Sequence, residues 1–103
     1  MVIDYREGEV YFRLTFPDAA LLFPIVETLV YVGKNLSDED SEDIWYFQFA
    51  EGYAKSGSIM TSKGGDRRVV LATRSELADI LTLNDLNQEL GMASARRADR
   101  ARK

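Results

Sequence analysis

The sequence predicts an α+β domain: a mainly antiparallel sheet of about five strands with C-terminal helices packed on one face. Three observations predict it. Apolar and polar residues alternate over residues 10–16, segments rich in β-branched and aromatic residues follow at 25–32 and 43–49, and two helix-start patterns lie beyond residue 72. Strands followed by helices, without strand-helix alternation, are typical of an α+β arrangement.

The alternation over residues 10–16 predicts a strand with one face on the core. The face assigned to the core carries four apolar side chains, Val10, Phe12, Leu14 and Phe16. A turn-like stretch at 5–9 precedes it and predicts a first hairpin arm over residues 2–6. Residues 25–32 carry apolar side chains on both faces, which predicts a central strand, and residues 43–49 predict the strand that returns beside it.

The middle of the chain is predicted to hold a short helix and a hairpin. Residues 50–57 suit one or two helical turns that end at Gly57. The Gly64-Gly65 pair stands between two strand-like segments, residues 58–62 and 67–72. Such a pair is typical of a two-residue hairpin turn.

The C-terminal third carries the clearest helix signals. Residues 73–76, Thr-Arg-Ser-Glu, form a capping-box pattern that predicts a helix over residues 77–81. Residues 82–85 repeat the signal and predict a helix that stops at Gly91. Either two short helices meet near Thr82 or one kinked helix runs through.

A chain of 103 residues with 46% hydrophobic and 29% charged residues has the composition of one globular domain. We assign the domain to residues 1–92 and a flexible basic tail to residues 93–103, because apolar anchors end at Met92. Residues 96–103 carry five positive charges and one negative, a net of +4, so the rest of the chain carries −8 within a total of −4. An acidic body favours cationic partners and disfavours nucleic acid.

The composition also bears on location. No run of about 18 uncharged apolar residues is present, so no membrane association is expected. The first residues lack the basic and apolar regions of a secretory signal, and the chain has no cysteine. We therefore expect a cytoplasmic protein.

Histidine and cysteine are both absent. Their absence excludes Ser-His-Asp and Cys-His nucleophilic sites and every zinc site built on those ligands. No cofactor is expected, and a binding protein is favoured over an enzyme. Glu27, inside an apolar strand, is either an acid with a raised pKa in a pocket, or a residue that faces the sheet edge or forms a salt bridge, for example with Arg13. The second interpretation is favoured.

Five carboxylates occupy six consecutive positions between two apolar segments. They are Asp38, Glu39, Asp40, Glu42 and Asp43. The run begins like a calcium-binding EF-hand loop, but the sixth position, where glycine is required, is Asp43, and the twelfth, where glutamate is required, is Phe49. A calcium site is therefore not expected, and the run is predicted to concentrate negative charge at a hairpin tip.

The aromatic run at residues 45–49 has a structural and a functional interpretation. In the structural one, one face of a strand joins the core and the other is solvated or covered by a helix. In the functional one, Trp45 or Tyr46 is an exposed anchor beside Asp43, because aromatic residues dominate binding hot spots. The candidate partner-binding site comprises the five carboxylates, Trp45 and Tyr46.

The leading hypothesis is a small acidic protein-interaction module that binds a basic protein through this loop and the adjoining aromatic edge. Inhibitors of nucleases and immunity proteins against basic toxins combine similar size, charge and lack of catalytic residues, which is an analogy of class and not of motif. One alternative is an enzyme or small-ligand-binding protein with a pocket around Glu27. Another is a homodimer that pairs through a sheet edge or the Leu83-Leu86-Leu90 helix face.

Overall fold

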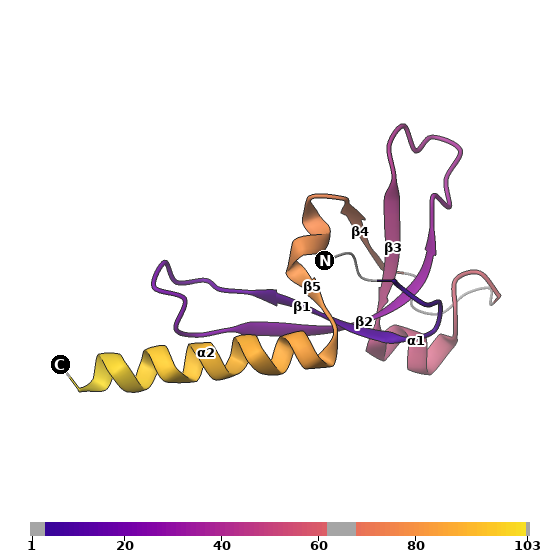
Figure 1. The fold of residues 1–103 in the computed structure, drawn as a ribbon. Coiled ribbons are helices and arrows are strands. Elements are labelled where there is room, and N and C mark those ends of the chain that lie inside the picture. Colours follow the sequence, from indigo (N-terminus) through magenta and orange to yellow (C-terminus); the bar gives the residue numbers. More distant parts are fainter. Residues whose placement is uncertain (1–3, 62–67, 103) are drawn as a thin grey trace.

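The computed structural model describes residues 4–61 and 68–102. It is elongated, 53 × 30 × 21 Å, with a curled sheet at one end and a long helix beside a protruding hairpin at the other (Figure 1). The elements in chain order are β1 (Val10–Thr15), β2 (Ile25–Lys34), β3 (Ile44–Phe49), α1 (Ala50–Ser56), β4 (Val69–Thr73), the 3₁₀ helix η1 (Glu76–Asp79), β5 (Ile80–Leu81) and α2 (Leu83–Ala101).

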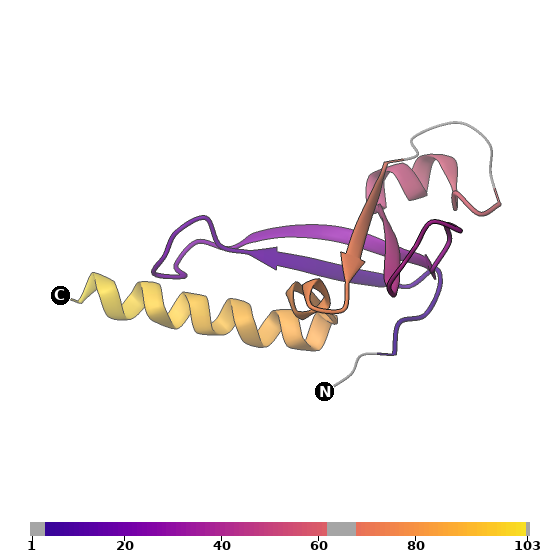
Figure 2. The same ribbon diagram turned by 90° about the horizontal axis from the view of Figure 1, so that it is seen from above.

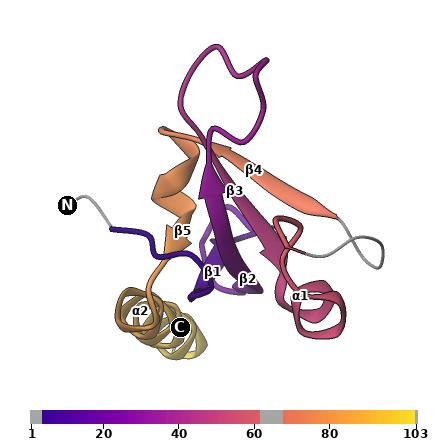
Figure 3. The ribbon, with the colours of Figure 1, turned by 90° about the vertical axis from the view of Figure 1, so that its right-hand side faces the viewer.

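The five strands form one antiparallel sheet in the order β4-β3-β2-β1-β5. The first four follow one another as a meander, and β5 returns to pair with the free side of β1. The two ends of the sheet are joined in sequence by η1, and the sheet curls as a result (Figure 3). The predicted α+β class, with an antiparallel sheet and a C-terminal helix, is confirmed.

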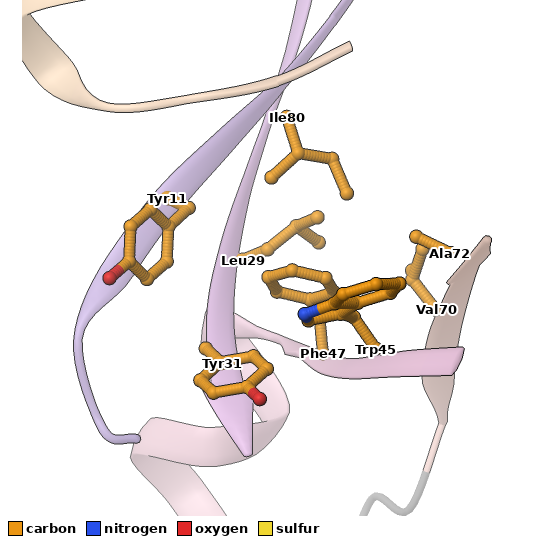
Figure 4. Close-up of a cluster of buried hydrophobic side chains, with 8 residues drawn as sticks. All are labelled: Tyr11, Leu29, Tyr31, Trp45, Phe47, Val70, Ala72 and Ile80. Atoms are coloured by element: carbon orange, nitrogen blue, oxygen red, sulfur yellow. The ribbon is translucent and has the colours of Figure 1, made fainter. Parts of the chain in front are cut away.

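The core lies inside the curl, and half of its buried members are aromatic. Its buried members are Tyr11, Leu29, Tyr31, Trp45, Phe47, Val70, Ala72 and Ile80 (Figure 4). The prediction that Val10 faces the core is wrong, because Tyr11 takes that place and Val10 is exposed. Leu14, on the opposite face of β1 from Tyr11, is also buried. Both faces of β1 carry apolar side chains, and α2 packs along this strand (Figure 2).

Two predicted strands are absent and one observed strand was not predicted. Residues 4–6 and 58–61 form no strand in the described part of the chain, and the Gly64-Gly65 hairpin lies outside it. The additional strand is β5, where a helix was expected. Only half of the predicted capping box forms, since the Thr73 backbone N–H and hydroxyl donate to Glu76 Oε1 at 3.1 and 2.9 Å, but the helix that follows is one 3₁₀ turn whose N-cap, Ser75, makes no side-chain capping bond. Burying Ile80 against β1 then outweighs continuing the helix.

Helix α2 begins as predicted and runs ten residues past Gly91, its predicted stop. The Thr82 hydroxyl accepts the Asp85 N–H at 3.3 Å, which confirms the N-cap. The stop at Gly91 is wrong, because the helix runs to Ala101 with Ala93 fully buried. The division into residues 1–92 and a flexible 93–103 stays a prediction. Of the helices in the described ranges, none combines the length and the hydropathy that a bilayer crossing needs.

Candidate functional site

The acidic run lies in the loop between β2 and β3, which projects from one end of the sheet (Figure 1, upper right). Asn35 closes the neck of this loop. Its backbone N–H donates to the Ile44 carbonyl at 2.8 Å, its side-chain oxygen accepts the Ile44 N–H at 2.8 Å, and its amide donates to Asp43 at 3.1 Å. Asn35 has φ of 55°, a left-handed conformation that asparagine tolerates better than most residues. One residue therefore fixes both ends of the loop.

Asp40 is bound inside the loop. Its carboxylate accepts the Tyr46 hydroxyl at 2.9 Å and the Ser37 N–H at 3.3 Å. Burial of the ring, together with the nearby Asp40 carboxylate, raises the pKa of Tyr46. The phenol therefore remains a proton donor at neutral pH and ties the loop to β3.

Asp43 is the most heavily paired of the five carboxylates. Besides Asn35, it contacts Lys34 Nζ at 3.4 Å and Arg74 Nη2 at 3.0 Å. Both cations also lie over the Trp45 ring, at 4.8 and 5.3 Å from its centroid. Trp45 thus supports the two cations that neutralise Asp43, and this corner of the loop carries less negative charge than the sequence indicates.

The remaining three carboxylates of the run differ from Asp40 and Asp43. Asp38, Glu39 and Glu42 are exposed, and their side chains make no hydrogen bond or ion pair within the part of the chain that the structure describes. Trp45 and Tyr46, by contrast, are only 8% and 9% exposed, so neither ring is the exposed anchor of the functional interpretation. The structure brings all seven predicted residues together and divides them into a supporting group and an exposed acidic group.

The pairing of Asp43 has a consequence for acid stability. The hydrogen bond from Asn35, with Lys34 and Arg74, lowers the pKa of Asp43 below its ordinary 3.8. A lowered folded-state pKa means that the stabilisation is complete above the unfolded value and is lost as the pH falls through the folded one. Asp43→Asn is therefore expected to lower the free energy of unfolding at pH 7, and the difference from wild type should vanish in strong acid.

Urea unfolding of both proteins across the acid range measures this difference. Asp38→Asn is the matched control, since its carboxylate has no partner in the described residues, and its pH profile should follow wild type. A wild-type advantage over Asp43→Asn that persisted unchanged below the ordinary aspartate pKa would contradict the assignment.

Glu27 forms the predicted ion pair. Arg13 Nη2 lies 2.6 Å and Nε 2.7 Å from Glu27 Oε1, and the two residues are direct cross-strand partners. Each side chain is about a third exposed, at 31% and 32%, so this is no desolvated acid. The pair borders a cavity of about 270 Å³ beside β4 and η1. No group of three metal-ligating side chains occurs among the described residues.

A second loop that is held by hydrogen bonds lies at the tip of the β1-β2 hairpin, and the sequence analysis did not predict it. The Asp18 carboxylate accepts the Leu22 and Phe23 N–H groups at 2.8 and 3.0 Å, which lowers its pKa. Arg96 and Arg97 of α2 donate to the Leu21 and Leu22 carbonyls at 2.7 and 2.6 Å.

These arginines had been assigned to the tail, and they bond across 75 positions of sequence, a pairing that no local pattern reveals. The loop presents Phe23 with 60% of its surface exposed. Asp18, between Pro17 and Pro24, was the one local sign of a capped turn.

Comparison of the chain with protein-family models, with curated proteins and with solved structures gives no match.

Proposed function

We propose that this chain is a protein-interaction module that binds a basic partner protein through its acidic loop. The observation that carries the proposal is that the carboxylates of the loop fall into a bonded group and an exposed group. Asp40 and Asp43 are bonded within the chain and hold the loop in one conformation, while Asp38, Glu39 and Glu42 are exposed and unpaired among the described residues.

A loop held in this way offers an energetic advantage to binding. Its backbone is restrained by the bonds of Asn35 and Asp40, so less conformational entropy is lost when a partner binds. The charge of −8 outside residues 96–103 attracts a cationic protein at long range, and such steering raises the association rate more than the affinity. Trp45 and Tyr46 contribute by holding the loop and its flanking cations, and not by direct contact. Inhibition of a basic toxin or nuclease is the biological role that this chemistry suits best.

The alternatives receive less support. The Glu27 carboxylate is engaged by Arg13, which leaves the pocket hypothesis without its candidate acid. On the helix face proposed for self-association, Leu86 is buried within the chain, although Leu83 is exposed. A binding module therefore fits the described residues better than an enzyme or a helix-paired dimer.

The test compares two charge-matched variants in their association with a partner. Immobilised wild-type chain captures basic proteins from a host extract, and a captured protein is purified for rate measurements. Asp38→Asn/Glu39→Gln/Glu42→Gln is expected to slow association about tenfold at low ionic strength and to flatten its salt dependence. Asp40 and Asp43 are left intact, so the loop should keep its conformation.

The control is Asp4→Asn/Glu7→Gln/Glu9→Gln, which removes the same charge from exposed carboxylates before β1. It is expected to change the rate much less. Equal slowing by both variants would assign the effect to net charge alone, and no slowing by the loop variant would remove the loop from the binding site.

A further inference from the structure

The two edges of the sheet differ in how their backbone groups are satisfied. At the β5 edge, the Tyr5 hydroxyl donates to the Ile80 carbonyl at 3.1 Å, and α2 begins two residues after β5 ends. At the other edge lies β4, whose outer side pairs with no strand of the described chain (Figure 3). Only the C-terminal end of β4 is covered, by η1 through the bond from the Thr73 N–H to Glu76. An uncovered edge strand presents a row of unpaired N–H and C=O groups.

The phase of the β3-β4 ladder identifies the outward-pointing groups. The Ile44 N–H and C=O both bond to Asn35, toward β2, so the Ile44-Thr73 pair exchanges no hydrogen bond. The Thr73 N–H is consistent with this assignment, because it donates to Glu76 and not to Ile44. Antiparallel pairs alternate, so the N–H and C=O of Leu71 also point away from β3. Leu71 is 51% exposed and has no other backbone partner in the described residues.

The cavity beside this edge is acidic. Its wall includes residues 70–72 of β4, together with Arg13, Glu27, Glu76 and Asp79. Three carboxylates against one guanidinium leave an excess of negative charge there. A strand added next to β4 would lie over this cavity.

We propose that the β4 edge binds an extended segment of a partner chain in which basic and apolar residues alternate. The backbone of that segment would pair with Leu71, and its residue opposite Leu71 would place an apolar side chain on the exposed outer face. Its neighbours in sequence would point to the side of Val70 and Ala72, where the cavity carboxylates meet a lysine or arginine. This site goes beyond the proposed function, because it uses none of the acidic loop, although β4 ends opposite Ile44 at the base of that loop.

The experiment measures binding of the full chain to a short capped peptide in which lysine and valine alternate. Binding is measured by fluorescence anisotropy in about 150 mM salt. Leu71→Pro removes one outward N–H and is tolerated at an edge strand whose N–H does not serve the ladder. It is expected to weaken binding about tenfold, while Leu71→Ala, which keeps the N–H, weakens it less. Glu76→Gln/Asp79→Asn should weaken binding of this peptide but not of its glutamine-for-lysine analogue.

A second measurement does not depend on the folding of Leu71→Pro. Methylating the peptide nitrogens on one edge should abolish binding to wild-type chain, and methylating those on the opposite edge should not. Equal binding of a scrambled peptide, or full binding by a folded Leu71→Pro, would overturn the proposal. So would a wild-type dimer in sedimentation that Leu71→Pro dissociates, since a second copy would then occupy the edge.

The acidic loop and the β4 edge are separable in the same assay. The Asp38→Asn/Glu39→Gln/Glu42→Gln variant is expected to bind the alternating peptide within about twofold of wild type. If that variant alone lost the peptide, the β4 inference would fail and the loop proposal would stand. Loss of peptide binding in Leu71→Pro alone supports the edge site, however strongly the loop variant changes association with the protein partner.

Discussion

Phe47→Ala is expected to lower the free energy of unfolding by about 3–5 kcal/mol. Phe47 is fully buried among the core side chains (Figure 4). Its ring lies 5.4 Å from Tyr31, 5.6 Å from Tyr5 and 6.4 Å from Tyr11, measured between centroids. Truncation removes the buried ring and leaves a cavity that three other aromatic rings must share. Against a typical total of about 5–15 kcal/mol, such a loss is a large fraction of the stability.

Urea unfolding measures this effect, and Phe23→Ala is the matched control. The chemical change is the same, but Phe23 is 60% exposed, so its cost should stay within about 0.5 kcal/mol. Should Phe47→Ala not fold, Phe47→Leu keeps most of the volume and is expected to fold with a smaller loss. Similar costs for the Phe47→Ala and Phe23→Ala variants would contradict the location of the core.

Gln48→Leu is expected to destabilise the chain by about 2–5 kcal/mol, although it makes the interior more apolar. Gln48 is 1% exposed, its Nε2 donates to the Gly57 carbonyl at 3.2 Å, and its Oε1 accepts the Ile59 N–H at 2.8 Å. These two bonds tie the segment after α1 to β3. Leucine has a similar size and can make neither bond, so the half-buried Gly57 carbonyl and Ile59 N–H both lose the partner that Gln48 supplies.

Urea unfolding measures the loss in free energy of unfolding, and amide hydrogen exchange at Ile59 reports whether Gln48 holds this segment. Exchange at Ile59 should accelerate in Gln48→Leu, while the core amide of Phe47 stays protected relative to it. Gln88→Leu makes the same chemical change at an exposed position of α2 and should leave both unchanged. An unaltered exchange rate at Ile59 would show that Gln48 does not hold this segment.

Local patterns were sufficient for much of the fold. The β2 and β3 strands, the loop between them, α1 and its end at Gly57 all lie where the sequence predicts. These elements depend on neighbouring residues: β-branched runs favour a pleated surface, and Gly57 adopts φ of 77° without steric cost. The N-cap at Thr82 is local in the same sense.

The errors occurred where distant residues compete with local preference. A capping box at residues 73–76 favours a helix, but Ile80 gains more from pairing with Arg13 on β1 and entering the core. Gly91 favours a helix stop, but the bonds of Arg96 and Arg97 to the hairpin tip stabilise the helix beyond Gly91. Both outcomes depend on contacts more than 60 positions apart, which no local window contains.

By itself, the sequence determined the class of the fold, the place of the acidic loop and the absence of histidine and cysteine chemistry, because these follow from composition and short-range periodicity. Only the tertiary structure decided which charges of that loop remain exposed. Lys34 and Arg74 reach Asp43 from two different strands' ends, and Tyr46 turns its hydroxyl onto Asp40. The physical reason is that a charge is neutralised by what lies near it in space, and the fold alone sets those neighbours.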